Sequence, residues 1–187
     1  MNLEKWFEKG ISAKQYVEQM EVNQENLLSI YNQFTLPEGE EAFIDGLKEK
    51  KLRVIVLTED WCSDAMLNVP ILLKLAEAAD MEVRFLYRDQ NLELMDQYLT
   101  NGVSRSIPIF IFLNQNGEEK AVWGPRAKEI QQIVIEKRSA LPPKDHPDFE
   151  KKQKEMMDQL KSSYLETEKY WYEVFDSLKT RLAERLF

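Results

Sequence analysis

Short, continuous apolar runs alternate with helical stretches in the middle of the chain, a pattern typical of an α/β fold. Runs rich in β-branched and aliphatic residues, typical of buried strands, lie at 54–57, 83–87 and 107–113. Apolar residues at helical spacing fill 62–76 and 92–99 between them. Asn116-Gly117 predicts a type I′ turn into a further strand at 118–123, and a helix follows Pro125. This order predicts a mixed β-sheet flanked by helices.

Residues 1–50 are predicted to form a helical extension. Ser12, followed three residues later by Gln15, forms a capping box. Asn23 can cap a second helix, and a third short helix is expected to end at the lysines near residue 50. The α/β pattern then occupies residues 51–140, which we interpret as one domain.

Residues 141–187 form a C-terminal extension that begins at the Leu141-Pro142-Pro143 break and keeps helical spacing to the end. A single helix of about 38 residues would be about 57 Å long, more than the width of a small domain. We therefore expect a bend near Ser162 and Ser163, or a helix that projects towards another subunit. Packing on the core and a homodimer through the terminal helices are the two alternatives.

Composition and charge restrict the class of protein. The 187 residues are 43% hydrophobic and 31% charged, which excludes collagen-like and wholly disordered chains. A net charge of −8 argues against binding to nucleic acid or to anionic lipid. The first residues lack a basic stretch followed by an apolar one, and no apolar run approaches the roughly 20 residues of a membrane span. We expect a cytoplasmic protein without a membrane or nucleic-acid partner.

The single cysteine, Cys62, is the main candidate for chemistry. With one cysteine and one histidine, the chain has no internal disulfide and none of the familiar zinc patterns, so we expect no metal. His146 is interpreted as a linker residue. Cys62 lies where a helix should begin, so that backbone N–H groups of Asp64 and Ala65 would point at its sulfur and favour the thiolate. Asp60 and Asp64 oppose this effect, and the balance is open at the level of sequence.

Pro108 is the second candidate feature, because it stands at the head of a run that otherwise reads as a central strand. Ile107-Pro108 is therefore a candidate cis bond beside a pocket. With these features in order, residues 51–139 resemble the thioredoxin superfamily. Asp60-Trp61-Cys62-Ser63-Asp64-Ala65 resembles its Trp-Cys-x-x-Cys turn, and Ser106-Ile107-Pro108 resembles its cis-proline loop. Asn116-Gly117 and Gly124 fall where that family has a hairpin and a glycine.

The resemblance implies a thioredoxin-like fold with roles for particular residues. In the family, the first cysteine attacks a disulfide, the cis-proline backbone aligns the partner chain, and the second cysteine resolves the mixed disulfide. By resemblance, Cys62 is the nucleophile. Trp61, Ile107 and Pro108 would form the substrate platform, and the active-site turn would comprise Asp60, Ser63, Asp64 and Ala65.

Two departures from the family pattern alter this expectation. Ala65 replaces the resolving cysteine, and Val56 replaces the buried aspartate of thioredoxins proper. The chain is then similar to one-cysteine glutaredoxins and bacilliredoxins. Cys62 would act on mixed disulfides of proteins or small thiols, with a low-molecular-weight thiol as co-substrate and no cofactor.

A redox-inactive binding or adaptor module is the alternative function. The missing cysteine and aspartate favour it, whereas the retained Trp61-Cys62 pair and Pro108 favour chemistry. A glutathione-transferase-like enzyme is a weaker hypothesis, because only 47 residues follow Ala140. Among the flanking charges, Asp64 is interpreted as a carboxylate that stabilises the helix start. Arg105 and Arg126 are by default solvated side chains, and the alternative is that they flank the pocket and bind a carboxylate of a small thiol or peptide.

Overall fold

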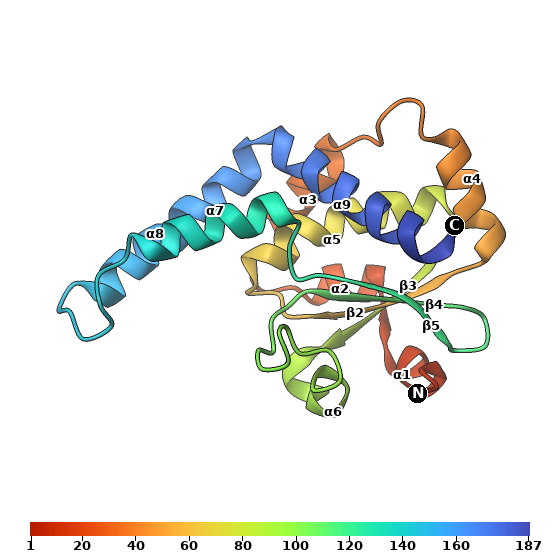
Figure 1. Cartoon of the computed structure of the whole chain (residues 1–187), viewed down its shortest axis with the longest axis horizontal. Coiled ribbons are helices and arrows are strands. Elements are labelled where there is room, and N and C mark those ends of the chain that lie inside the picture. Colours follow the sequence, from red (N-terminus) through yellow and green to blue (C-terminus); the bar gives the residue numbers. More distant parts are fainter.

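A five-stranded mixed sheet lies at the centre of the computed structural model, which describes all residues from 1 to 187 (Figure 1). Its strands are β1 (Ile11–Ser12), β2 (Arg53–Thr58), β3 (Glu82–Tyr87), β4 (Ile109–Leu113) and β5 (Glu119–Trp123). They are ordered β1-β3-β2-β4-β5; β2 and β3 are parallel and the other pairs antiparallel. The mixed sheet predicted from the apolar runs is confirmed.

Helices cover both faces of this sheet (Figure 1). They are α1 (Glu4–Lys9), α2 (Ala13–Gln19), α3 (Gln24–Gln33), α4 (Glu41–Lys50), α5 (Ser63–Ala78), α6 (Leu92–Met95), α7 (Lys128–Ser139), α8 (Phe149–Glu166) and α9 (Glu168–Leu186), with a 3₁₀ turn, η1, at Arg88–Gln90. Helix α5 is buried on almost every side, since β3, α3, α8 and α9 all contact it. None of these helices combines the length and the apolar character that a membrane span requires.

The N-terminal segment also contributes a strand, which the sequence pattern did not predict. Ile11 and Ser12 pair with Phe85 and Arg84 and extend the sheet beyond β3. Directly after this strand, the ring of Tyr16 stacks on Phe85 at a centroid distance of 4.3 Å. A two-residue strand has no periodicity of its own, so only the assembled sheet reveals it.

Of the three predictions about helix caps and turns, the structure confirms one and contradicts two. The capping box of Ser12 and Gln15 is confirmed by both reciprocal hydrogen bonds. Asn23 precedes α3 in a left-handed conformation, its amide nitrogen donates to the Asp60 carbonyl, and its side-chain oxygen makes no cap. The type I′ turn at Asn116-Gly117 is wrong, since only Gly117 has a positive φ (76°) and a type I′ turn needs two such residues.

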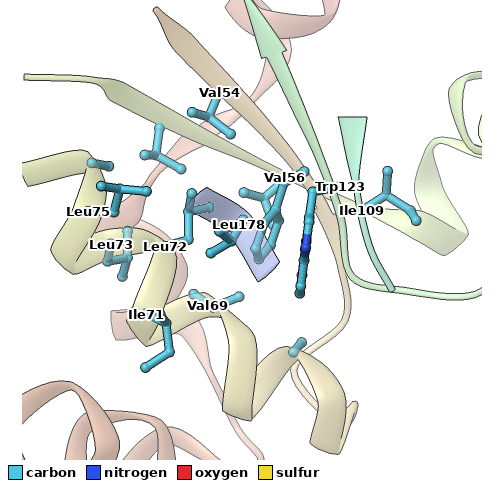
Figure 2. Packing of buried hydrophobic residues seen from close by; sticks show 14 of the residues in the cluster. Val54, Val56, Val69, Ile71, Leu72, Leu73, Leu75, Ile109, Trp123 and Leu178 are labelled. Carbon is cyan, nitrogen blue, oxygen red and sulfur yellow. The ribbon is translucent and has the colours of Figure 1, made fainter. Parts of the chain in front are cut away.

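The C-terminal segment turns back over the core at Thr167, between α8 and α9, and not at the expected Ser162 and Ser163. Helices α7 and α8 lie side by side as an arm that extends beyond the sheet (Figure 1). Helix α9 returns across α5 and β5. Figure 2 shows side chains of the sheet, α5 and α9 gathered in one cluster, with Val56, Leu72 and Leu178 as examples.

We expect Trp171→Ala to lower the free energy of unfolding by about 3–5 kcal/mol, a typical cost for truncating a buried tryptophan. Trp171 of α9 is 2% exposed, and its indole N–H donates to the Tyr164 carbonyl at 2.7 Å. Chemical denaturation measures the difference. Ile135→Ala on α7, where the side chain is 50% exposed, serves as the control and should change stability by less than about 1 kcal/mol. Equal losses in the two variants would mean that α9 is not part of the core.

Candidate active site

Cys62 lies between the end of β2 and the start of α5, where it is the N-cap residue of the helix. Its Sγ accepts a hydrogen bond from the Ala65 backbone N–H at 3.5 Å, because amides of the first turn have no partner within the helix. The thiol in turn donates to the Ile107 carbonyl at 3.5 Å. The structure thus brings together Cys62 and the loop that carries Pro108, which are 46 residues apart in sequence.

The environment of Cys62 favours the protonated thiol. Burial raises the pKa of Cys62 to about 12, and the neighbouring Asp64 carboxylate acts in the same direction. The backbone amides of Ala65 and Asp64 and the Arg126 guanidinium counteract this rise in pKa only in part. Desolvation therefore outweighs the helix terminus, and the sequence alone did not show that only 8% of Cys62 is exposed.

The loop before Cys62 is anchored on two sides. The Asp60 carboxylate accepts hydrogen bonds from the backbone N–H groups of Glu21 and Val22 at 2.8 and 3.2 Å. The Asn23 amide donates to the Asp60 carbonyl at 3.0 Å. On the other side, buried Glu59 accepts a bond from the Asp89 backbone N–H at 2.9 Å, and burial raises the pKa of its carboxyl. The N-terminal extension and the end of β3 thereby fix the position of the turn.

Trp61 is the exposed member of this turn. Half of its surface (51%) is accessible, and the Arg88 guanidinium lies 5.1 Å from its ring centroid. Ser63, one residue beyond the cysteine, is partly exposed, whereas Ala65 is 1% exposed. On either side of Cys62 in sequence, the turn therefore exposes an aromatic ring and a hydroxyl.

Two cis peptide bonds lie in the loops at this site, and one of them was a candidate from the sequence. Ile107-Pro108 is cis, as expected, and Gly124-Pro125 is cis as well. Gly124 has a φ of +127°, and a Cβ at this position would overlap the Pro108 carbonyl oxygen. Asn68 of α5 donates to the Pro125 carbonyl at 2.9 Å. The Gly-Pro pair in the sequence was the signal that could have identified this second loop.

Asp64 and Arg126 form a buried ion pair, which corrects the interpretation of Arg126 as a solvated side chain. Their closest atoms are 2.6 Å apart, and the side chains are 12% and 11% exposed. The Tyr164 hydroxyl donates to the other oxygen of Asp64 at 2.9 Å. Arg105 does remain at the surface, where it pairs with Asp96 at 2.7 Å. Sequence spacing gave no sign of the ion pair, because its two partners are 62 residues apart.

An open polar cleft of about 970 Å³ lies beside these loops. Ser106 and Arg126 line it together with residues of α7 and α9. No cluster of three or more His, Cys, Asp or Glu side chains is placed to hold a metal ion. Cys62 and Pro108 do not line the cleft themselves, and it reaches the site through Ser106 and Arg126.

We expect alkylation of Cys62 in the folded protein to accelerate steadily from about pH 7 to about pH 10 without a plateau. The reason is that burial raises the pKa of the thiol to about 12, so the reactive thiolate remains a minor form throughout this range. The same shift in pKa also affects stability. Above about pH 9 the Cys62 thiol of the unfolded chain loses its proton, whereas that of the folded protein keeps it, so the free energy of unfolding falls as the pH rises. Iodoacetamide labelling followed by mass spectrometry measures the rate, and the unfolded chain in urea, with a midpoint at about pH 8.5 and a plateau at about pH 10, is the control. Identical pH midpoints in the two states would contradict the burial of the sulfur.

Comparisons with known proteins agree with this geometry. A family model described as thioredoxin matches residues 10–140. The chain is 31% identical over 101 residues to thioredoxin H-type 1 of Nicotiana tabacum, a match that covers 52% of this chain and 75% of that protein.

Two solved structures share the fold over nearly the whole chain. A protein of unknown function from Pseudomonas aeruginosa has a TM-score of 0.62 and 15% identity, and the match covers 96% of this chain and 98% of the other. An HIV epitope-scaffold has a TM-score of 0.64 and 16% identity, with coverages of 95% and 96%. The family match spans well over half of the chain, and the chain therefore belongs to the thioredoxin family.

Proposed function

We propose that the protein is a monothiol thiol–disulfide oxidoreductase in which Cys62 is the nucleophile. Membership of the thioredoxin family supports a redox function in general. The observation that carries the specific proposal is the position of the one thiol, with Sγ 3.5 Å from both the Ala65 N–H and the Ile107 carbonyl. Its sulfur thus faces an amide that stabilises a thiolate and a backbone group adjacent to Pro108.

The reaction consists of two exchanges. After the thiol proton has passed to solvent base, the Cys62 thiolate attacks one sulfur of a mixed disulfide, which breaks the S–S bond and releases the first thiol as its thiolate. A low-molecular-weight thiolate then attacks the new disulfide on Cys62 and regenerates the protein. One disulfide is reduced and one is formed, so no further electron donor enters the cycle. The external thiol is required because Ala65 has no sulfur.

The contacts of Cys62 also suggest how the sulfur becomes accessible. A protonated Cys62 donates to the Ile107 carbonyl, whereas a thiolate has no proton to donate and is repelled by that oxygen. In the proposed mechanism, deprotonation therefore releases Sγ from the loop, and the substrate lies against Trp61, Ile107 and Pro108. The residues Asp60, Ser63, Asp64 and Ala65 hold the turn in place during the exchange, and the polar cleft beyond Ser106 gives room for the rest of the substrate.

The test uses a peptide whose single cysteine is disulfide-bonded to glutathione, with reduced glutathione as the second substrate. We expect release of the peptide thiol at a rate that depends on the protein and on glutathione. Intact-mass analysis without reduced glutathione should show one covalent adduct on Cys62. Release no faster than in buffer, with no adduct on Cys62, would overturn the proposal and favour the adaptor module.

A further inference from the structure

We infer that Arg126 and Tyr164 are positioning residues for Cys62, because together they hold the Asp64 carboxylate of the active-site turn in one place. Tyr164 belongs to α8, which lies beyond residue 140, where the family match ends. The C-terminal helices would thus complete the reactive site as well as the core. This inference rests on the proposed function only in that it treats Cys62 as the reacting group.

Both oxygens of Asp64 are used in this network. One lies 2.6 Å from an Arg126 guanidinium nitrogen, and the other accepts the Tyr164 hydroxyl at 2.9 Å. The Arg126 guanidinium also donates to Gln131 of α7 at 2.9 Å. Tyr164 is completely buried, so its hydroxyl has no access to water and is committed to Asp64. Three parts of the chain, α5, the start of α7 and α8, therefore meet next to the cysteine.

A buried ion pair is a weak source of stability, because removing two charges from water offsets most of their attraction. Its position beside the thiol is what gives it an effect on chemistry. The ionisable groups near Cys62 on the surrounding elements are Asp64, Arg126, Tyr164 and, from α2, Tyr16. Of these, Asp64 opposes formation of the thiolate and Arg126 favours it.

Because Asp64 and Arg126 shift the pKa of Cys62 in opposite directions, substitutions at the two residues distinguish a positioning role of this network from a role in packing alone. At a pH well below the pKa, a one-unit fall in the pKa of a thiol gives about ten times more thiolate. The thiolate is then about threefold less nucleophilic, so the observed rate rises only about threefold. At pH 8.5 we expect Asp64→Asn to be alkylated at least about threefold faster than the wild type, and Arg126→Gln at least about threefold slower. A loss of packing would instead expose the sulfur and accelerate both variants.

Tyr164→Phe is the mildest variant, because it removes one hydroxyl and keeps the ring. Without this donor, more of the charge on Asp64 acts on the thiol, and alkylation should slow about twofold. Tyr170→Phe is the matched control, since its ring packs edge-on against Tyr164 at 6.4 Å but its hydroxyl is not bonded to Asp64. It should react at the wild-type rate.

The measurement is the iodoacetamide rate of each full-length variant between pH 7.5 and pH 9.5, with chemical denaturation run in parallel. Shifts of opposite sign in Asp64→Asn and Arg126→Gln, with a slower Tyr164→Phe, would support the inference. Acceleration of all three variants, or a Tyr164→Phe rate equal to that of Tyr170→Phe, would overturn it. Because alkylation needs no disulfide substrate, failure of the proposed function and failure of this inference give different results.

Discussion

Cys62→Ser is expected to abolish thiol–disulfide exchange while the protein remains folded. Cys62 is the one cysteine of the chain, and a seryl oxygen does not form a mixed disulfide. The substitution replaces a buried sulfur by a smaller hydroxyl, which can still accept from the Ala65 N–H and donate to the Ile107 carbonyl. We therefore expect the free energy of unfolding to change by only about 1 kcal/mol. Exchange is measured with the glutathionylated peptide, and folding by circular dichroism.

Arg105→Ala provides the control for this experiment. Arg105 is exposed and pairs with Asp96 on the surface, so its loss should leave both exchange and folding unchanged. Exchange by Cys62→Ser at the wild-type rate would show that the reaction does not pass through this sulfur. Capture of a protein partner that is equally strong with Cys62→Ser and with the wild type would favour the adaptor module instead.

The fold was largely predictable because its signals are local. The apolar runs of β2, β3 and β4 and the helical spacing of α5 are each contained in a few residues. The position of Cys62 at the head of a helix follows from the same pattern. The exposed Trp61 and the loop at Pro108 could also be located from sequence, since each is marked by its own residue type.

The environment of the thiol could not be predicted, because it depends on residues far apart in the chain. The Ile107 carbonyl is 45 residues from Cys62, and Tyr164 is 100 residues from Asp64. The sequence showed a helix start, which favours the thiolate, and two aspartates, which oppose it. The burial of the sulfur, which decides the direction of its pKa, arises only when the surrounding elements are in place.

The two aspartates of the turn illustrate the same limit. Both were expected to act on Cys62 through their charge. In the structure, the Asp60 carboxylate binds the backbone at Glu21 and Val22, whereas Asp64 forms an ion pair with Arg126. One therefore anchors the N-terminal extension, and the other connects the turn to the loop after β5. Sequence neighbours with the same charge thus have different structural partners.

Ala65→Cys is expected to give the protein a second mechanism, with an intramolecular disulfide in place of the external thiol. The Ala65 backbone N–H lies 3.5 Å from the Cys62 sulfur, and Cys62 caps the first helical turn, to which Ala65 belongs. A thiol at position 65 is therefore close enough to attack a mixed disulfide on Cys62. Ala65 is 1% exposed, and the added sulfur should cost about 1–3 kcal/mol of stability through overpacking.

We expect Ala65→Cys to reduce the disulfides of insulin with dithiothreitol at least about tenfold faster than the wild type, since resolution becomes intramolecular. After oxidation, intact mass and thiol titration should show a disulfide and no free thiol. Ala76→Cys is the matched control, because Ala76 is a buried alanine (2% exposed) of the same helix, more than three turns from Cys62. It should keep two free thiols and the wild-type rate. If Ala65→Cys instead behaves like Ala76→Cys, the loss of the second cysteine is not what limits this site, and the burial of Cys62 itself would be the dominant restraint on its chemistry.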